Sequence, residues 1–204
     1  MLVTANDRDK VGAAISAAEK ATSGEIVAVI ASSSASYVSV APLVAALVAL
    51  LVPWPLIYFT WWPVQWIYLL QLAVFAVVGA IAYYRPVRLA LVPKSIKNER
   101  AHKRAVEQFL AQNLYTTKSH TGVLIFISSA ERYAEIIADK NIYIKVPQER
   151  WQALVDRLTL RIGEGDPADG LVETITETGA LMATHFPPGN SNPDELPNHL
   201  IVID

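Results

Sequence analysis

The feature that most constrains this chain is a long stretch without charge: residues 26–84 contain no Asp, Glu, Lys or Arg. Two segments inside it, residues 38–59 and 62–84, are each about long enough to cross a bilayer as a helix, which takes roughly 20 residues. The sequence therefore predicts a two-helix transmembrane hairpin. The alternative is a buried helical hairpin in a soluble protein, but a domain of this size has no room to enclose two such helices on all sides.

Aromatic residues mark the turn between the two segments. Thr60 is followed by Trp61, Trp62 and Pro63, and further Trp and Tyr side chains flank this turn, namely Trp54, Tyr58, Trp66 and Tyr68. Aromatic residues gather where helix ends meet lipid headgroups, so we expect the turn to lie at a membrane surface. Pro53 and Pro55 are expected to kink the first helix or end it early, because proline lacks an N–H and clashes with the preceding turn.

The charges that flank the hairpin predict its orientation. The turn has no charge, whereas seven cations follow the second segment, namely Arg85, Arg88, Lys94, Lys97, Arg100, Lys103 and Arg104. Cytoplasmic flanks carry an excess of Lys and Arg, so both chain ends are predicted to be cytoplasmic and the turn to be outside.

The rest of the chain is sufficient for one ordinary domain. Of 204 residues, roughly 150 lie outside the hairpin. We expect residues 1–35 and 86–204 to form this domain together, with the hairpin at residues 36–85 inserted between them. The net charge of −2 gives no sign of nucleic-acid binding, and the absence of cysteine excludes disulfides and thiolate chemistry.

Apolar periodicity predicts an alternation of helices and strands. Two continuous apolar runs, residues 25–31 and 121–128, are typical of strands buried on both faces, and residues 133–138 form a hairpin partner for the second. An edge strand is expected at residues 200–203. Helices are predicted at residues 7–22, capped by Asn6 or Asp7, then at 96–114, at 148–162, ended by Gly163, and at 171–185.

Three carboxylates are the candidate metal ligands. Glu164, Asp166 and Asp169 fall in a Gly-rich stretch, residues 163–170, and could begin a calcium site, although calcium takes six to eight oxygen ligands. Alternatively, Asp169 caps the following helix and Asp166 with Pro167 makes the turn. No phosphate-binding loop, nucleophile elbow or paired histidines occur, so no catalytic residue is assigned.

Serines occupy the ends of both buried strands: Ser32, Ser33 and Ser34 after the first, and Ser128 and Ser129 at the second. Open α/β sheets bind ligands at such ends, although most serines there satisfy backbone groups in turns. Because the first strand leads directly into the membrane, its carboxyl end should face the bilayer. We expect this edge, together with the Arg85, Arg88 and Lys94 cations, to contact lipid headgroups or a membrane partner. The basic segment can also be read as a plain linker.

Three stretches resemble the TPM domain family, named for a thylakoid lumen protein, a photosystem II repair protein and a worm acetylcholine-receptor modulator. They are AEKATSGEIVAVI, TGVLIFISSAERYAEIIAD and WQALVDRL followed by GEGDPADGLVETITETGALMATHFPP. The sequence closely resembles the bacterial membrane branch of this family. The resemblance implies an α/β fold, a three-layer α/β/α sandwich around a mixed sheet, here interrupted by the hairpin, in a bacterial inner membrane.

The resemblance also implies two classes of function. Animal members are membrane-anchored receptor modulators, and plant members are weak acid phosphatases that bind calcium. Many members carry Asp-Asn-Gly at the entry to the strand predicted here at residues 121–128. This sequence has His120, Thr121 and Gly122 instead, so it lacks that carboxylate of the metal site. We therefore expect an interaction or regulatory module at the cytoplasmic face, with a weak metal-dependent acid phosphatase as the alternative. Its expected partners are the lipid bilayer and a membrane protein or a second copy, since Gly79 and nearby alanines permit close helix approach.

Overall fold

The computed structural model describes residues 4–117, 120–188 and 196–203. The chain forms two compact units. The sheet unit contains the residues up to Ser34 and those from Asn98 onward, and the helical unit runs from Ala35 to Lys97. Residues 86–97, which the sequence assigned to the domain, thus group with the apolar helices. The reason is local: α5 (Arg85–Leu91) packs on α2 (Val40–Leu51) and α4 (Val64–Tyr83).

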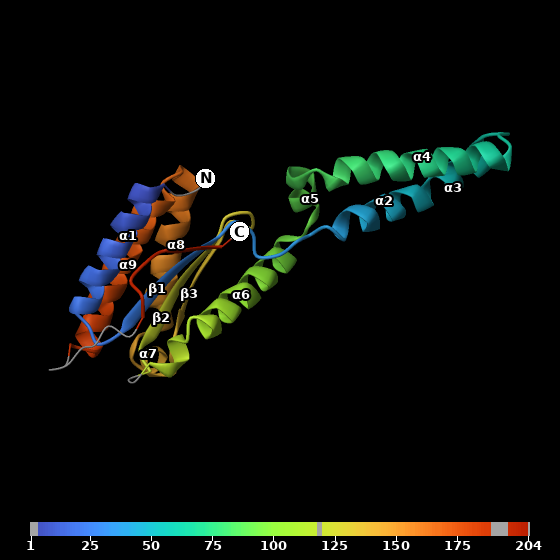
Figure 1. Ribbon diagram of the computed structural model, residues 1–204. Coiled ribbons are helices and arrows are strands. Elements are labelled where there is room, and N and C mark those ends of the chain that lie inside the picture. Colours follow the sequence, from blue (N-terminus) through green and yellow to red (C-terminus); the bar gives the residue numbers. More distant parts are fainter. Residues whose placement is uncertain (1–3, 118–119, 189–195, 204) are drawn as a thin grey trace. The chain divides into compact units, whose positions relative to one another are not determined.

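A four-stranded mixed sheet forms the centre of the sheet unit (Figure 1). Its order is β3-β2-β1-β4, with β1 at Glu25–Ala31, β2 at Gly122–Ser128, β3 at Tyr133–Ala138 and β4 at Ile201–Ile203. β1 is parallel to β2 and β4, whereas β2 and β3 form an antiparallel hairpin. Every residue of β1 and β2 is buried, which confirms the prediction made from their continuous apolar runs.

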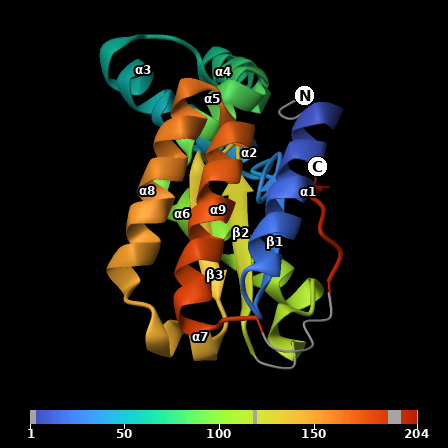
Figure 2. The same cartoon turned by 90° about the vertical axis from the view of Figure 1, so that its left-hand side faces the viewer.

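Helices cover both faces of the sheet, which gives the three layers that the resemblance implied. On one face, Ile26, Ala28 and Ile30 pack with α1 (Ala5–Lys20), α8 (Gln148–Glu164) and α9 (Pro167–His185) (Figure 2). On the other, Val27 and Val29 pack with α6 (Lys94–Ala111). Successive strand residues point to opposite faces, so an uninterrupted apolar strand can serve both layers. Each fully buried large side chain contributes about 1.5–3 kcal/mol to this core.

The helices of the sheet unit differ from the predicted ones mainly at their ends. Thr4, not Asn6 or Asp7, caps α1: its hydroxyl accepts from the Asp7 N–H, and the Asp7 carboxylate accepts from the Thr4 N–H and hydroxyl. These hydrogen bonds lower the pKa of Asp7. In α6, Ala101 and Ala105 are buried, whereas Leu110 is 52% exposed. Short helices at Leu114–Thr116 (η1) and Lys140–Lys145 (α7) complete the unit.

The carboxylate-bearing stretch at residues 163–170 is mostly helical, contrary to the loop expected there. α8 continues through Gly163 to Glu164 and ends at Gly165, whose φ of 97° is readily adopted only by glycine. α9 begins two residues later at Pro167, four residues earlier than predicted. Proline is favoured in the first turn of a helix because its missing N–H would have no partner there. Only Gly165 and Asp166 lie between the two helices.

The helical unit contains two helices that are long and apolar enough to cross a membrane, Val40–Phe59 and Val64–Tyr83. The first is divided at Pro53 into α2 and α3 (Pro53–Phe59), as its prolines predict. Ala41, Ala45 and Ala49 are buried on α2, and a Cβ placed on Gly79 of α4 would lie 3.6 Å from the Ala45 Cβ. Gly79, one of the small residues that suggested self-assembly, therefore packs within the pair. Large apolar side chains, among them Leu43, Leu47 and Leu72, are exposed.

Candidate functional site

The carboxyl ends of the three parallel strands meet at one edge of the sheet. β1 pairs with β2 from Glu25 opposite Gly122 to Ala31 opposite Ser128. Beyond the strands, the Ser129 N–H donates to the Ala31 carbonyl at 3.0 Å and the Ser32 N–H to the Ile203 carbonyl at 2.8 Å. β1 and β2 are thus parallel, and the serines at their carboxyl ends come together at this edge.

A buried carboxylate organises those serines. Glu131, in the turn between β2 and β3, is only 5% exposed. It accepts hydrogen bonds from the Ser128 hydroxyl, from the Ser33 hydroxyl at 3.1 Å and from the Ser34 N–H at 3.1 Å. The Ser34 hydroxyl donates to the Ser128 Oγ at 2.7 Å. A buried carboxylate requires such donors, since leaving it without them would cost several kcal/mol. We call these four residues the serine–glutamate cluster.

The cluster changes the role assigned to the predicted contact serines. Ser128 is fully buried, so it cannot touch a headgroup or a partner as predicted; its hydroxyl is used inside the fold. Ser33 and Ser34 are partly buried and hold Glu131. Ser32 is partly buried, with its N–H in the extension of the sheet. Only the Ser129 hydroxyl, among these serines, has no hydrogen-bond partner within the described ranges.

A cavity of about 590 Å3 opens beside this edge, entirely within the sheet unit. We call it the edge cavity. Side chains of β1, β2, β3 and α8 give it an apolar floor, from Ile30, Ile127, Ala134 and Ile162. Its rim comes from the β2–β3 turn and from the junction of α8 with α9, with Ser129, Arg132, Tyr133, Thr159, Gly163, Gly165 and Pro167. The volume lies in the range of small-molecule sites, about 300–1,000 Å3.

Arg132 stands out in this rim. Its φ is 52°, the left-handed conformation that is uncommon for residues other than glycine. Its N–H donates to the Ser129 carbonyl at 3.3 Å, which closes the turn that Glu131 anchors. The side chain is exposed, and its guanidinium forms no ion pair with any residue that the structure describes. The turn therefore presents a cation at the mouth of the edge cavity.

The three candidate metal ligands are not brought together. Glu164 pairs with Arg161 at 3.8 Å, and Asp169 pairs with Lys10 of α1, also at 3.8 Å. Asp166 is the N-cap residue of α9, without a capping hydrogen bond from its side chain. In the described ranges, no group of three His, Asp or Glu side chains could hold a metal ion. Calcium binding stays a prediction, and it has no assembled site here.

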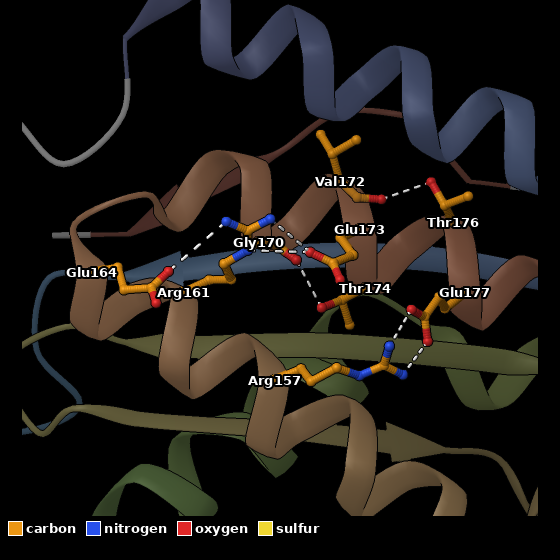
Figure 3. A network of polar contacts seen from close by, with 9 residues as sticks. All are labelled: Arg157, Arg161, Glu164, Gly170, Val172, Glu173, Thr174, Thr176 and Glu177. Carbon is orange, nitrogen blue, oxygen red and sulfur yellow. Dashed lines mark hydrogen bonds and ion pairs between the residues drawn. The ribbon is translucent and has the colours of Figure 1, made fainter.

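Glu164 belongs instead to an ion-pair network that joins α8 to α9 (Figure 3). The Arg157 guanidinium donates two hydrogen bonds to the Glu177 carboxylate, and the Arg161 guanidinium donates one to the Glu173 carboxylate at 3.2 Å. The helices approach closely at Gly170, where a Cβ would lie 2.7 Å from the Arg161 Cβ. These ion pairs link α8 to α9, and the junction between the two helices forms one side of the edge cavity.

A second polar group lies on the opposite face of the sheet, beneath α6. The His102 Nδ1 is 2.8 Å from the Glu135 carboxylate, which also accepts from the Tyr133 hydroxyl at 3.1 Å. Burial, and next the charge of Glu135, raise the pKa of the Tyr133 hydroxyl far above its usual range. This phenol is therefore neutral and serves as a donor that positions Glu135.

The predicted cations Arg85, Arg88 and Lys94 belong to the helical unit. Arg85 and Lys94 are exposed, at the starts of α5 and α6. The Arg88 guanidinium lies over the Tyr83 ring, 5.7 Å from its centroid, and Lys97 donates to the Leu89 carbonyl at 3.3 Å. Arg85 and Lys94 are thus the most accessible of the three predicted cations.

A family model for the TPM domain matches residues 85–181. The chain carries a TPM domain. The match covers α6, β2, β3 and α8, together with most of α9. β1 precedes the matched segment in sequence, on the other side of the helical unit, yet it pairs with β2 along its whole length. The TPM domain of this chain is therefore completed by α1 and β1 from before the apolar helices.

The fold of this chain also resembles a solved structure. The BA42 protein of the psychrophilic bacterium Bizionia argentinensis, determined by NMR, matches with a TM-score of 0.62 at 22% sequence identity. The match covers 98% of this chain and 94% of that protein. Identity at this level shows a common fold and nothing finer. No curated protein matches the chain.

Proposed function

We propose that this chain is a membrane-anchored TPM-domain protein whose domain acts as an interaction or regulatory module at the cytoplasmic face of a bacterial inner membrane. In this proposal the two apolar helices of the helical unit are the anchor, and both chain ends lie in the cytoplasm. The carboxyl edge of the sheet is the part of the domain held nearest to the bilayer.

The observation that carries the proposal is the point at which the anchor interrupts the domain. β1 ends at Ala31 and the first candidate span begins at Val40. At about 3.3–3.6 Å per residue, the connection between them reaches at most roughly 30 Å. Since β1, β2 and β4 are parallel, their carboxyl ends lie at the same sheet edge, the one from which this connection leaves. The carboxyl edge is therefore the edge that the chain ties directly to the anchor, and in this proposal it is the edge at the membrane surface.

The exposed cations agree with such a surface. Arg85 and Lys94 are exposed close to the end of the second candidate span at Tyr83. Cytoplasmic leaflets carry anionic lipids, which attract basic segments by about 1 kcal/mol per Lys or Arg near the surface. These cations would strengthen the attachment of a domain that works on a membrane partner.

The absence of cysteine allows a direct test on the full chain. Ala130→Cys places a fluorophore at the carboxyl edge, and Lys140→Cys places the matched control at the opposite edge, after β3. Strands of seven residues separate the two edges by about 23 Å. In vesicles with spin-labelled headgroups, we expect stronger quenching at position 130. Equal quenching, or stronger quenching at position 140, contradicts the proposal.

Two assays on the purified full chain distinguish the interaction module from the alternative function, a weak acid phosphatase. Calcium-dependent turnover of p-nitrophenyl phosphate that disappears in an Asp166→Ala, Asp169→Ala double variant would favour the phosphatase. Absence of turnover, with a membrane protein or a second copy retained on purification in mild detergent, would favour the module.

A further inference from the structure

We propose that the edge cavity binds a small molecule with an apolar body and one anionic end group, a carboxylate or a phosphate. This binding activity goes beyond membrane anchoring, and it does not depend on where the bilayer lies, because every residue that lines the cavity belongs to the sheet unit.

The interior of the cavity suits an apolar body. Ile30, Ile127 and Ala134 extend the core face of the sheet into it, and Ile162 of α8 closes one side. Two glycines keep the remaining side open: a Cβ placed on Gly163 or Gly165 would meet no atom within 4 Å. Burying apolar ligand surface here is worth about 25 cal/mol per Å2.

The rim supplies donors for one anion. Arg132 and Ser129 both line the cavity, and neither the Arg132 guanidinium nor the Ser129 hydroxyl has a partner among the described residues. A guanidinium binds carboxylate or phosphate with two parallel hydrogen bonds, and charge-assisted bonds of this kind are about twice as strong as neutral ones. The other polar rim groups are engaged, since the Thr159 hydroxyl donates to the Val155 carbonyl and the Tyr133 hydroxyl to Glu135.

Neighbouring carboxylates do not compete for Arg132. Glu131 is buried and surrounded by the donors of the serine–glutamate cluster. Glu164 pairs with Arg161, and neither Glu164 nor Asp166 lines the edge cavity. The charge that the cavity offers to a ligand is therefore positive.

The turn holds Arg132 in a costly conformation. A non-glycine residue at φ 52° is uncommon and persists only where its surroundings impose it. Here the anchored Glu131 and the bond from the Arg132 N–H to the Ser129 carbonyl impose it. The buried cluster thus sets the direction in which the arginine leaves the backbone at the cavity mouth.

Two variants remove the two halves of the site. Arg132→Asn removes the cation with a residue that tolerates the left-handed conformation. Gly163→Leu places an apolar side chain at the open side of the cavity, where its Cβ would meet no atom within 4 Å, and leucine is a better helix former than glycine. Two matched controls on the exposed surface of α8 are Arg150→Asn and Ala153→Leu.

The test uses the full chain in nanodiscs and the probe benzylphosphonate, whose C–P bond resists hydrolysis, so that binding is measured apart from turnover. Ligand-observed NMR should show saturable binding, with neutral benzyl alcohol binding more weakly. We expect the affinity for benzylphosphonate to fall about tenfold or more in both cavity variants, and to be unchanged in both controls.

The natural ligand can come from the membrane or from solution, and extraction of the purified chain followed by mass spectrometry distinguishes these sources. An acidic lipid retained by the wild type and the controls, but not by the cavity variants, supports a lipid ligand. Selective benzylphosphonate binding without retained lipid supports a soluble one. The proposal is overturned if the wild type, both cavity variants and both controls bind benzylphosphonate equally. It is also overturned if the wild type shows neither saturable binding nor retained lipid.

Discussion

At the scale of single residues, Glu131 is the side chain on which the sheet edge most depends. Its carboxylate accepts from the Ser34 N–H and from the Ser33 and Ser128 hydroxyls. In Glu131→Gln, one acceptor oxygen is replaced by an NH2 donor that faces these donors. We expect the free energy of unfolding to fall by about 1–3 kcal/mol, measured by urea unfolding of the full chain in mild detergent with far-ultraviolet circular dichroism. The exposed Glu99→Gln on α6 is the control; equal stability of the two variants would contradict this role for Glu131.

Sequence reasoning reached part of this edge. The serines at this edge are predictable because they stand at the ends of continuous apolar runs, and those runs are parallel strands with adjacent ends. Glu131 and Arg132 lie between two predicted strands, so the sequence places them in a turn and indicates nothing more about them. The sequence around these residues predicts neither the burial of Glu131 nor the left-handed φ of Arg132. The pairing of Glu164 and Asp169 with Arg161 and Lys10 likewise depends on helices that only the fold brings together.

At the scale of elements, strands and helix interiors were predictable, whereas helix ends were not. β1 and β2 follow from their apolar runs, and α8 from its apolar stripe, which buries Trp151, Leu154 and Leu158. The predicted end of α8 was wrong because Gly163 and Gly165 stand two positions apart, and the sequence does not tell which of them has a positive φ and ends the helix. The carboxylates of that stretch then looked like loop ligands, although Glu164 and Asp169 are helical.

Alanine substitutions at Gly163 and Gly165 are expected to change the free energy of unfolding in opposite directions. Gly163 is helical with open space at its Cβ position, so Gly163→Ala should stabilise the protein by about 0.5–1 kcal/mol through higher helix propensity. Gly165 has a φ of 97°, so Gly165→Ala should destabilise it by about 1 kcal/mol. Urea unfolding of both variants under the same conditions is the measurement, and each variant is the control for the other. Changes of the same sign would contradict the assignment of Gly165 as the residue that ends α8.

At the scale of the whole molecule, the chain forms one sheet unit whose sequence is interrupted by a helical unit. The interruption was predictable, because a charge-free stretch of this length has few structural uses. Its second boundary was not, since α5 is short and basic and resembles a linker, yet it packs with the apolar pair. The pairing of β1 with β2 across the interruption could be expected only from the similarity of two buried apolar strands.

The orientation proposed for the two candidate membrane spans can be tested with single cysteines. Asn6 precedes the helical unit and is exposed in the first turn of α1, whereas Trp61 lies in the connection between α3 and α4 and is fully exposed. If the cations that follow Tyr83 hold both flanks in the cytoplasm, a membrane-impermeant maleimide should label Trp61→Cys in intact cells. Asn6→Cys should be labelled only after the membrane is permeabilised, and the cysteine-free parent chain serves as the blank. Labelling of Asn6→Cys in intact cells, with protection of Trp61→Cys, would reverse the orientation. Labelling of both at equal rates in purified protein that needs no detergent would remove the anchor altogether.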